Sequence, residues 1–99
     1  MDRKAASADI IEVGRRMYQR ALVAANDGNI SVKLEEDRIL ITPTGVSKGF
    51  MTEDMLIVVD YDGKVVEGNR KPSTEVFMHT AVYRHRPDVG AVVHAHPPA

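Results

Sequence analysis

Two histidines separated by a single residue, His94 and His96, are the strongest chemical signal in the chain. They end an apolar stretch that is typical of a strand, and alternate residues of a strand project from the same face. Two imidazoles on one rigid face can share a metal ion, with Zn–N distances of about 2.0–2.1 Å. The pair therefore predicts a metal site at the end of a strand. The alternative is two unrelated histidines at an exposed strand end.

The segment Pro72-Ser73-Thr74-Glu75 carries a second set of polar groups, at a point where a loop leads into a predicted helix. Free backbone N–H groups and hydroxyls at such a junction form a ready anion site. A carboxylate there can simply complement the helix dipole. Glu75 can equally serve as a third metal ligand or as a general base, and its position alone leaves all three roles open.

Two short polar loops complete the set of candidate residues. Asp27-Gly28-Asn29-Ile30-Ser31 leads into a predicted strand, and Thr42-Pro43-Thr44-Gly45 follows one. Neither loop matches the spacing of a P-loop or of a dinucleotide-binding fingerprint. Both are compatible with ordinary turns, but their amide, hydroxyl and glycine N–H donors could converge on a phosphate group.

Hydrophobic periodicity indicates the elements that position these groups. Apolar residues recur at helical spacing near the N-terminus, and they alternate or form short runs in the later segments. Asp62-Gly63 between two apolar runs predicts a tight hairpin turn. We expect helices over residues 3–23 and 75–85, and strands over residues 30–34, 38–42, 56–59, 64–67 and 89–96. This order predicts an α/β fold in which helices flank a layered, largely antiparallel sheet.

Composition excludes several classes of protein. The chain has 99 residues, of which 43% are hydrophobic and 27% charged, as in one globular domain. Its formal net charge of −1 argues against a nucleic-acid binder that works by bulk charge. Because there is no cysteine, histidines and carboxylates would have to hold any metal. No apolar stretch is long enough to cross a membrane and no signal-peptide core is present, so we expect a cytoplasmic protein without membrane partners.

The last predicted strand bears on domain organisation. Residues 89–93 are too apolar for the edge of a sheet, and the sequence that follows offers nothing to cover them. We therefore expect residues 1–99 to be the N-terminal portion of a single domain in a longer protein.

Four motifs occur in order along the chain: Gly28-Asn29-Ile30-Ser31, Thr42-Pro43-Thr44-Gly45, Lys71-Pro72-Ser73-Thr74-Glu75 and Val92-Val93-His94-Ala95-His96. In this order and spacing they resemble the class II aldolase/adducin family, from the first predicted helix to the last residue. The resemblance implies a zinc-dependent aldolase that reversibly cleaves a ketose 1-phosphate, similar to fuculose phosphate, into dihydroxyacetone phosphate and an aldehyde. Family members are longer and form homotetramers with active sites between subunits.

The resemblance also implies a role for each matched position. His94 and His96 match two of the family's three zinc-binding histidines. Glu75 matches the catalytic acid/base, which can also bind the metal. The positions that hold the substrate phosphate are matched by Asn29, Thr44, Gly45, Ser73 and Thr74. The family's third metal histidine and its C-terminal proton-transfer tyrosine have no counterpart in these 99 residues.

Several other functions remain open within the same resemblance. Related enzymes are pentulose-5-phosphate 4-epimerases, which usually have aspartate at the position of Glu75, and sugar-phosphate dehydratases. A non-catalytic, adducin-like module would lack the metal ligands, so His94 and His96 count against it. The 99-residue chain by itself is expected to be inactive, because part of the site is missing.

The remaining candidate side chains have simpler interpretations. His79 lies one turn after Glu75 and could brace that carboxylate, although packing within the helix is the simpler role. His85 lies near the end of the same predicted helix, where a cation suits the dipole. Lys48 is expected to be a solvated loop lysine.

Overall fold

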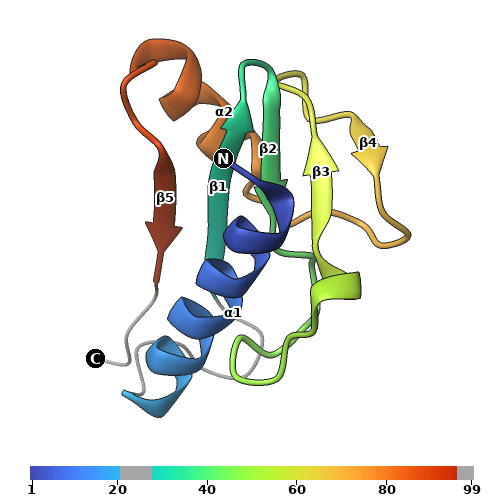
Figure 1. The fold of residues 1–99 in the computed structure, drawn as a ribbon, viewed down its shortest axis with the longest axis vertical. Coiled ribbons are helices and arrows are strands. Elements are labelled where there is room, and N and C mark those ends of the chain that lie inside the picture. The colour runs from blue at the N-terminus through green and yellow to red at the C-terminus, as the bar shows by residue number, and fades with distance from the viewer. Residues whose placement is uncertain (21–27, 96–99) are drawn as a thin grey trace.

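Residues 1–20 and 28–95 are described by the computed structural model, and they fold into three layers with a sheet in the middle (Figure 1). This part of the chain contains helices α1 (Arg3–Gln19) and α2 (Val76–His85), the short 3-10 helix η1 (Glu53–Met55), and strands β1 (Asn29–Glu35), β2 (Arg38–Ile41), β3 (Ile57–Val59), β4 (Val65–Glu67) and β5 (Ala91–His94). The strand order is β4-β3-β2-β1-β5, and every neighbouring pair is antiparallel. The predicted α/β fold, with a layered and largely antiparallel sheet, is confirmed.

Helix α1 covers one face of the sheet, in front of the strands in Figure 1. It begins at Asp2, whose carboxylate accepts a hydrogen bond of 3.3 Å from the backbone N–H of Ala5. The apolar side chains of Ala6, Ile10 and Met17 recur at helical spacing and are buried. They pack against the sheet residues Ile30, Val32, Leu40, Leu56 and Val58.

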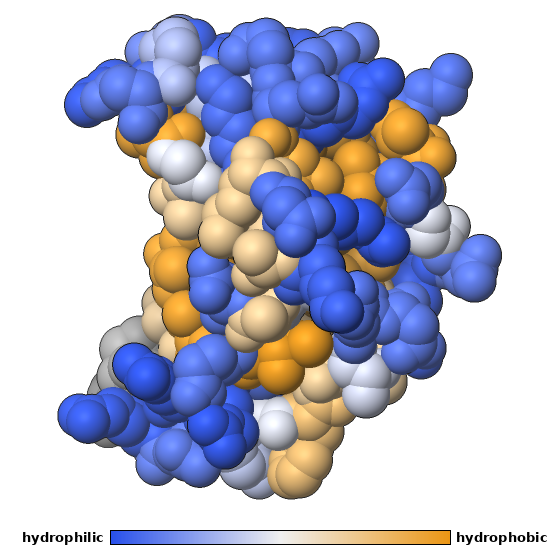
Figure 2. Space-filling model, in the orientation of Figure 1, coloured by the Kyte–Doolittle hydropathy of each residue, from blue (hydrophilic) through white to orange (hydrophobic). Residues whose placement is uncertain are grey.

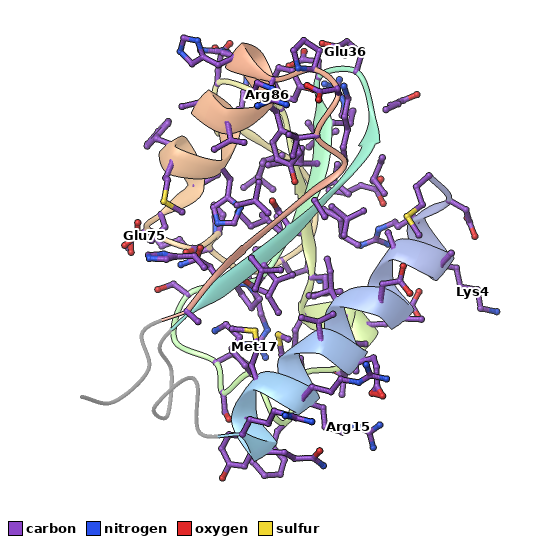
Figure 3. The ribbon with its side chains drawn as sticks, turned by 90° about the vertical axis from the view of Figure 1, so that its left-hand side faces the viewer. Lys4, Arg15, Met17, Glu36, Glu75 and Arg86 are labelled. Carbon is purple, nitrogen blue, oxygen red and sulfur yellow. The ribbon has the colours of Figure 1, made fainter. Side chains whose placement is uncertain are left out.

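Helix α2 covers the opposite face, and Figure 3 shows the two helices on either side of the strands. Val76 and Tyr83 of α2 are buried against the sheet, together with Ile39, Ile41, Ile57, Val59 and Tyr61. Successive residues of β2 and β3 thus point alternately to α1 and to α2. Because both faces are covered, these two strands consist of continuous apolar runs.

Two tight turns set the order of the strands. Between β1 and β2 the chain turns at Asp37, which has a φ of 63°. Between β3 and β4, the backbone N–H of Gly63 donates to the carbonyl of Asp60 at 3.0 Å. Gly63 has a φ of 81°, in the left-handed region that favours glycine. The hairpin turn predicted from Asp62-Gly63 is therefore confirmed.

The structure differs from the sequence-based bounds at both ends. Helix α1 ends at Gln19, because Arg20 leaves the helical backbone with φ −93° and ψ 9°; the predicted continuation over 21–23 lies outside the described residues. Strand β5 is shorter than predicted, and within the described residues it lies at the edge of the sheet. Val92 packs toward α2, but Val93 points to the other face and is 52% exposed, so one face of β5 is left uncovered.

That uncovered face forms an apolar groove of about 620 Å³ between α1 and β5. Its lining includes Ile10 and Val13 of α1, Ile30 of β1, and Ala91 and Val93 of β5. Figure 2 shows apolar surface on this side of the molecule between two hydrophilic ends. No helix in the described part of the chain is long and apolar enough to cross a membrane.

Candidate metal and phosphate site

Strand β1 brings polar side chains to the α2 face of the sheet. Ile30 and Val32 point to the α1 cluster, so the alternating residues Asn29 and Ser31 point to α2. Both are buried, with exposed fractions of 3% and 0%. Buried polar groups need partners, and α2 supplies them through His79 and Tyr83, which lie four residues apart on its buried side.

These side chains form one hydrogen-bonded set, which we call the polar network: Tyr83, Ser31, His79, Asn29 and His94. The Ser31 hydroxyl lies 2.7 Å from the Tyr83 hydroxyl and 2.6 Å from His79 Nδ1. On the other side of the ring, His79 Nε2 donates to Asn29 Oδ1. Asn29 Nδ2 donates in turn to His94 Nδ1 at 3.5 Å. The network therefore runs from the interior of α2 to the end of β5.

Burial controls the charge of the two ionisable groups inside the network. Desolvation, reinforced by the nearby His94, lowers the pKa of His79 from 6.5 to about 4, so its ring is neutral at physiological pH. Desolvation also raises the pKa of Tyr83 to about 12, against the opposing effect of its contact with Ser31. Both groups therefore act as neutral hydrogen-bonding partners.

The two loops that carry the predicted phosphate residues lie side by side. Pro43 and Pro72 form an isolated antiparallel bridge. The N–H of Thr44 donates to the carbonyl of Lys71 at 3.0 Å, and the N–H of Ser73 donates to the carbonyl of Thr42 at 3.1 Å. Main-chain hydrogen bonds thus hold the 42–45 and 71–75 segments in a fixed relative position.

The first of these loops is also tied to β1. The N–H of Ile30 donates to Thr42 Oγ1 at 3.2 Å, and the N–H of Thr42 donates to the carbonyl of Ile30 at 3.1 Å. Asn29 therefore lies next to a residue that anchors the Thr44–Gly45 loop. The structure brings all five predicted phosphate residues to one end of the sheet, although it does not test whether they bind phosphate.

Accessibility differs among those five residues. Thr44, Gly45 and Thr74 are exposed, whereas Asn29 and Ser73 are buried. Gly45 has a φ of 75°, and a Cβ built on it would meet no atom within 4 Å. Open space beside an exposed backbone is what an incoming anion needs. The positive φ, and not a lack of space, is therefore the reason for glycine at this position.

Glu75 is the N-cap residue of α2 rather than the first helical residue. Its N–H donates to Ser73 Oγ at 3.1 Å, which fixes the turn that leads into the helix. The side chain is half-buried, and Figure 3 shows it at the start of α2, pointing away from the sheet. The His79 ring makes hydrogen bonds with Asn29 and Ser31. The interpretation that its side chain supports the Glu75 carboxylate is therefore wrong.

The predicted metal ligands are only partly described. His94 is half-buried at the end of β5 beside Asn29, and His96 lies outside the described residues. Among the described residues, no group of three or more histidine, cysteine or acidic side chains is close enough to hold an ion. The donor set predicted here, two imidazoles and a carboxylate, is of the kind that zinc binds. In chemical type, the residues fit the metal.

Sequence reasoning missed one member of the polar network, Tyr83, and misjudged one lysine. Ser31 was noted only as part of a polar loop and motif, although Asn29 and Ser31 on one strand face and His79 and Tyr83 on one helix face could have been matched. Lys48 is 1% exposed rather than solvated, and its Nζ donates to the carbonyl of Val46 at 2.9 Å.

Comparison with known proteins places this fold and these motifs in one family. Residues 8–99 match the class II aldolase and adducin N-terminal domain. The chain therefore belongs to the class II aldolase/adducin family. Relatives include a methylthioribulose-1-phosphate dehydratase from Gluconacetobacter diazotrophicus, which is 48% identical over 89% of this chain. They also include an L-fuculose phosphate aldolase from Methanocaldococcus jannaschii, which is 42% identical over 97% of it.

Solved structures support the same assignment. YgbL from Klebsiella pneumoniae superimposes on 98% of this chain with a TM-score of 0.91 and 34% sequence identity. The chain spans less than half of each of these proteins: 43% of the dehydratase, 49% of the aldolase and 46% of YgbL. The relatives of this class II aldolase-like chain are thus named for different reactions, among them an aldolase and a dehydratase.

Proposed function

We propose that the complete protein carrying this chain is a metal-dependent aldolase that reversibly cleaves a ketose 1-phosphate into dihydroxyacetone phosphate and an aldehyde. The observation that carries the proposal is the contact between Asn29 and His94, because it joins a predicted phosphate residue to a predicted metal ligand. In a ketose 1-phosphate the phosphate is on the carbon next to the carbonyl, so an aldolase of this kind needs its phosphate-binding and carbonyl-binding groups close together.

In this proposal the phosphate lies at the loops that carry Thr44, Gly45, Ser73 and Thr74, with Asn29 beside them. Their hydroxyl, amide and backbone N–H groups are neutral donors to an anion, and the start of α2 adds its dipole. Because the loops are tied to each other and to β1, the phosphate would be bound in one place. Binding energy from this remote group would hold the reacting carbons in position.

Glu75 would move the proton. When the carbon–carbon bond breaks, its electron pair stays on the carbon that becomes part of dihydroxyacetone phosphate, and the hydroxyl on the other carbon releases its proton to solvent as it becomes the aldehyde carbonyl. The Glu75 carboxyl group then delivers a proton to that carbon, and in the reverse direction its carboxylate removes it. This role requires a carboxylate within hydrogen-bond reach of the substrate. The half-buried side chain at the start of α2 fits that requirement.

His94, His96 and Glu75 would hold a zinc ion or another divalent metal. When bound, the metal supplies Lewis-acid stabilisation of the negative charge that develops on the substrate oxygens. A catalytic zinc site normally has three protein ligands and one open position. This chain contributes two imidazoles and a carboxylate as candidate ligands, and the family resemblance implies a further histidine from the remainder of the protein.

A sugar-phosphate dehydratase is the second candidate, because the relative with 48% identity is named as one. Both candidates use a ketose phosphate, so the phosphate loops do not distinguish them. The base at Glu75 would remove a carbon-bound proton in the dehydratase as well. What differs is the bond that breaks: carbon–carbon in the aldolase, and carbon–oxygen with loss of water in the dehydratase.

The test is to incubate the complete protein, loaded with zinc, with L-fuculose 1-phosphate and separately with methylthioribulose 1-phosphate. Formation of dihydroxyacetone phosphate from the first, measured by an enzyme-coupled reduction, would support the aldolase. Loss of one water from the second, measured by mass spectrometry, would support the dehydratase instead. A chelator should abolish either activity, and zinc should restore it. Turnover that survives complete metal removal would contradict both proposals.

We further propose that the complete protein is a cytoplasmic homotetramer with sites between subunits, as the family resemblance implies. Light scattering coupled to gel filtration measures the assembly directly. A mass of four subunits supports this assembly, and an active monomer contradicts it.

A further inference from the structure

His79 of the candidate site is fully buried, with an exposed fraction of 0%, and none of the proposed catalytic steps uses it. Both nitrogens of this buried ring have hydrogen-bond partners, and both partners belong to the candidate site. Here Nδ1 lies 2.6 Å from the Ser31 hydroxyl and Nε2 donates to Asn29 Oδ1. The ring therefore bridges two buried residues of β1 from the opposing helix.

The direction of these hydrogen bonds follows from their chemistry. The Asn29 carboxamide oxygen can only accept, so the proton of the neutral His79 ring lies on Nε2. His79 Nδ1 then accepts from the Ser31 hydroxyl, and the Ser31 oxygen accepts from the Tyr83 hydroxyl. The hydrogen bonds therefore run in one direction, from Tyr83 through Ser31 and His79 to Asn29.

The consequence falls on Asn29, whose carboxamide has one oxygen and one NH₂ group. Because its oxygen is held by His79, its NH₂ group faces His94 and the end of the sheet. The contact with His94 uses one of the two N–H bonds, which leaves the second for a ligand. If the carboxamide were turned over, an oxygen would face the incoming anion and repel it.

We propose that His79 is a positioning residue, which fixes the orientation of the Asn29 carboxamide so that its NH₂ group, and not its oxygen, faces the substrate phosphate. The part that concerns phosphate rests on the proposed function. The part that concerns the orientation of Asn29 stands on the polar network alone. The two parts can therefore be tested separately.

A pair of substitutions in the complete protein separates positioning from packing. In His79→Gln the amide group lies near the place of Nε2, so it can still reach Asn29. In His79→Asn the amide group lies near the place of Nδ1, so it can reach Ser31 but loses Asn29. Both variants remove the ring, so packing alone predicts similar effects for the two. His85→Gln, on the exposed end of the same helix, is the matched control.

The first measurement is the NMR signal of the Asn29 side-chain NH₂ group in protein labelled with ¹⁵N-asparagine. We expect two separate, sharp proton resonances in the wild type, in His79→Gln and in His85→Gln, and exchange-broadened resonances in His79→Asn. The second measurement is the Kd for inorganic phosphate by calorimetry. It should rise about tenfold in His79→Asn, the loss of one hydrogen bond to a charged group, and less than about threefold in His79→Gln.

Each outcome decides one part. If the wild type does not bind phosphate, the proposed function fails, while the Asn29 resonances still decide the role of His79. Sharp Asn29 resonances in His79→Asn would overturn the positioning role. Equal broadening in both His79 variants would also overturn it, because the ring would then act through its volume alone.

Discussion

Among the side chains of the 71–75 segment, Glu75 alone carries a carboxylate, the type of group suited to general acid/base work. Its neighbours Ser73 and Thr74 contribute hydroxyls, and Lys71 contributes a fixed positive charge. The segment thus combines groups suited to binding with one group suited to proton transfer, and the two functions can be separated by substitution.

Replacement of Glu75 by glutamine in the complete protein should lower kcat by at least about 100-fold, the usual scale for loss of a general acid/base. The fold should be unaffected, because the Glu75 N–H bond to Ser73 Oγ does not involve the side chain. Steady-state kinetics and circular dichroism measure the two effects. Glu53→Gln, in exposed η1 on the α1 side of the sheet, should retain full activity. Near-normal turnover by Glu75→Gln would contradict the assignment.

The buried ring of His79 makes stability depend on pH. Its pKa is lowered from 6.5 to about 4 in the folded protein, chiefly by desolvation. As the pH falls below 6.5, the unfolded chain takes up a proton on this ring that the folded chain does not. The neutral ring therefore contributes about 3 kcal/mol to the free energy of unfolding. This contribution is complete above pH 6.5 and is lost as the pH falls to 4.

Denaturant unfolding of the metal-free protein at a series of pH values from 7.5 to 4.5 tests this dependence. His79→Gln cannot titrate, so its free energy of unfolding should decrease less over that range than that of the wild type. Parallel curves for the two proteins would contradict the lowered pKa.

Helix α1 and the loop before η1 approach each other closely at Gly14. A Cβ on Gly14 of α1 would lie 2.6 Å from the carbonyl oxygen of Lys48 and 2.6 Å from Met51 Cε. Glycine at this position lets the loop lie directly on the helix. This close approach explains why Lys48 is buried, which its exposed-looking sequence context did not indicate.

Replacement of Gly14 by alanine should therefore destabilise the protein by about 1–3 kcal/mol, because the backbone of the loop has to move. The gain in helix propensity, about 1 kcal/mol, offsets only part of this cost. Gly90→Ala is the matched control, since a Cβ there meets no atom within 4 Å. Thermal unfolding measures both variants, and a Gly14→Ala protein as stable as the wild type would contradict the close packing.

At the scale of the whole molecule, the two faces of the sheet are covered unequally. Helix α2 covers its side as far as Val92 of β5, whereas α1 leaves the groove beside Val93 open. An uncovered edge strand next to an apolar groove favours pairing with another chain. The other edge strand, β4, is short and fully exposed.

The 99-residue chain, produced by itself, should therefore associate as its concentration rises. Val93→Lys should reduce the association, because it places a charge on the β5 edge without removing a buried side chain. Val65→Lys is the control, a valine of similar exposure (41% against 52%) on the opposite edge strand. Multi-angle light scattering measures the mass of each variant. A monodisperse wild-type monomer at high concentration, or equal effects of both substitutions, would contradict association through β5.

The sequence by itself determined the type and order of the elements, because these depend on local patterns. The period of α1, the continuous runs of β2 and β3, and the Asp62-Gly63 turn all lie within a few residues of one another. The four motifs and their order can likewise be recognised in the sequence, so the class II aldolase/adducin family was predictable from residues such as Asn29, Glu75 and His94.

Only the tertiary structure decided which polar groups meet. The partners in the polar network are 48 to 65 residues apart in sequence, so no local pattern joins His79 to Ser31 or Asn29 to His94. Periodicity reports which face of an element is apolar, but it does not report which element will pack on that face. Whether a buried histidine is a space filler or a bridge, and whether Lys48 is solvated or enclosed, depends on that packing.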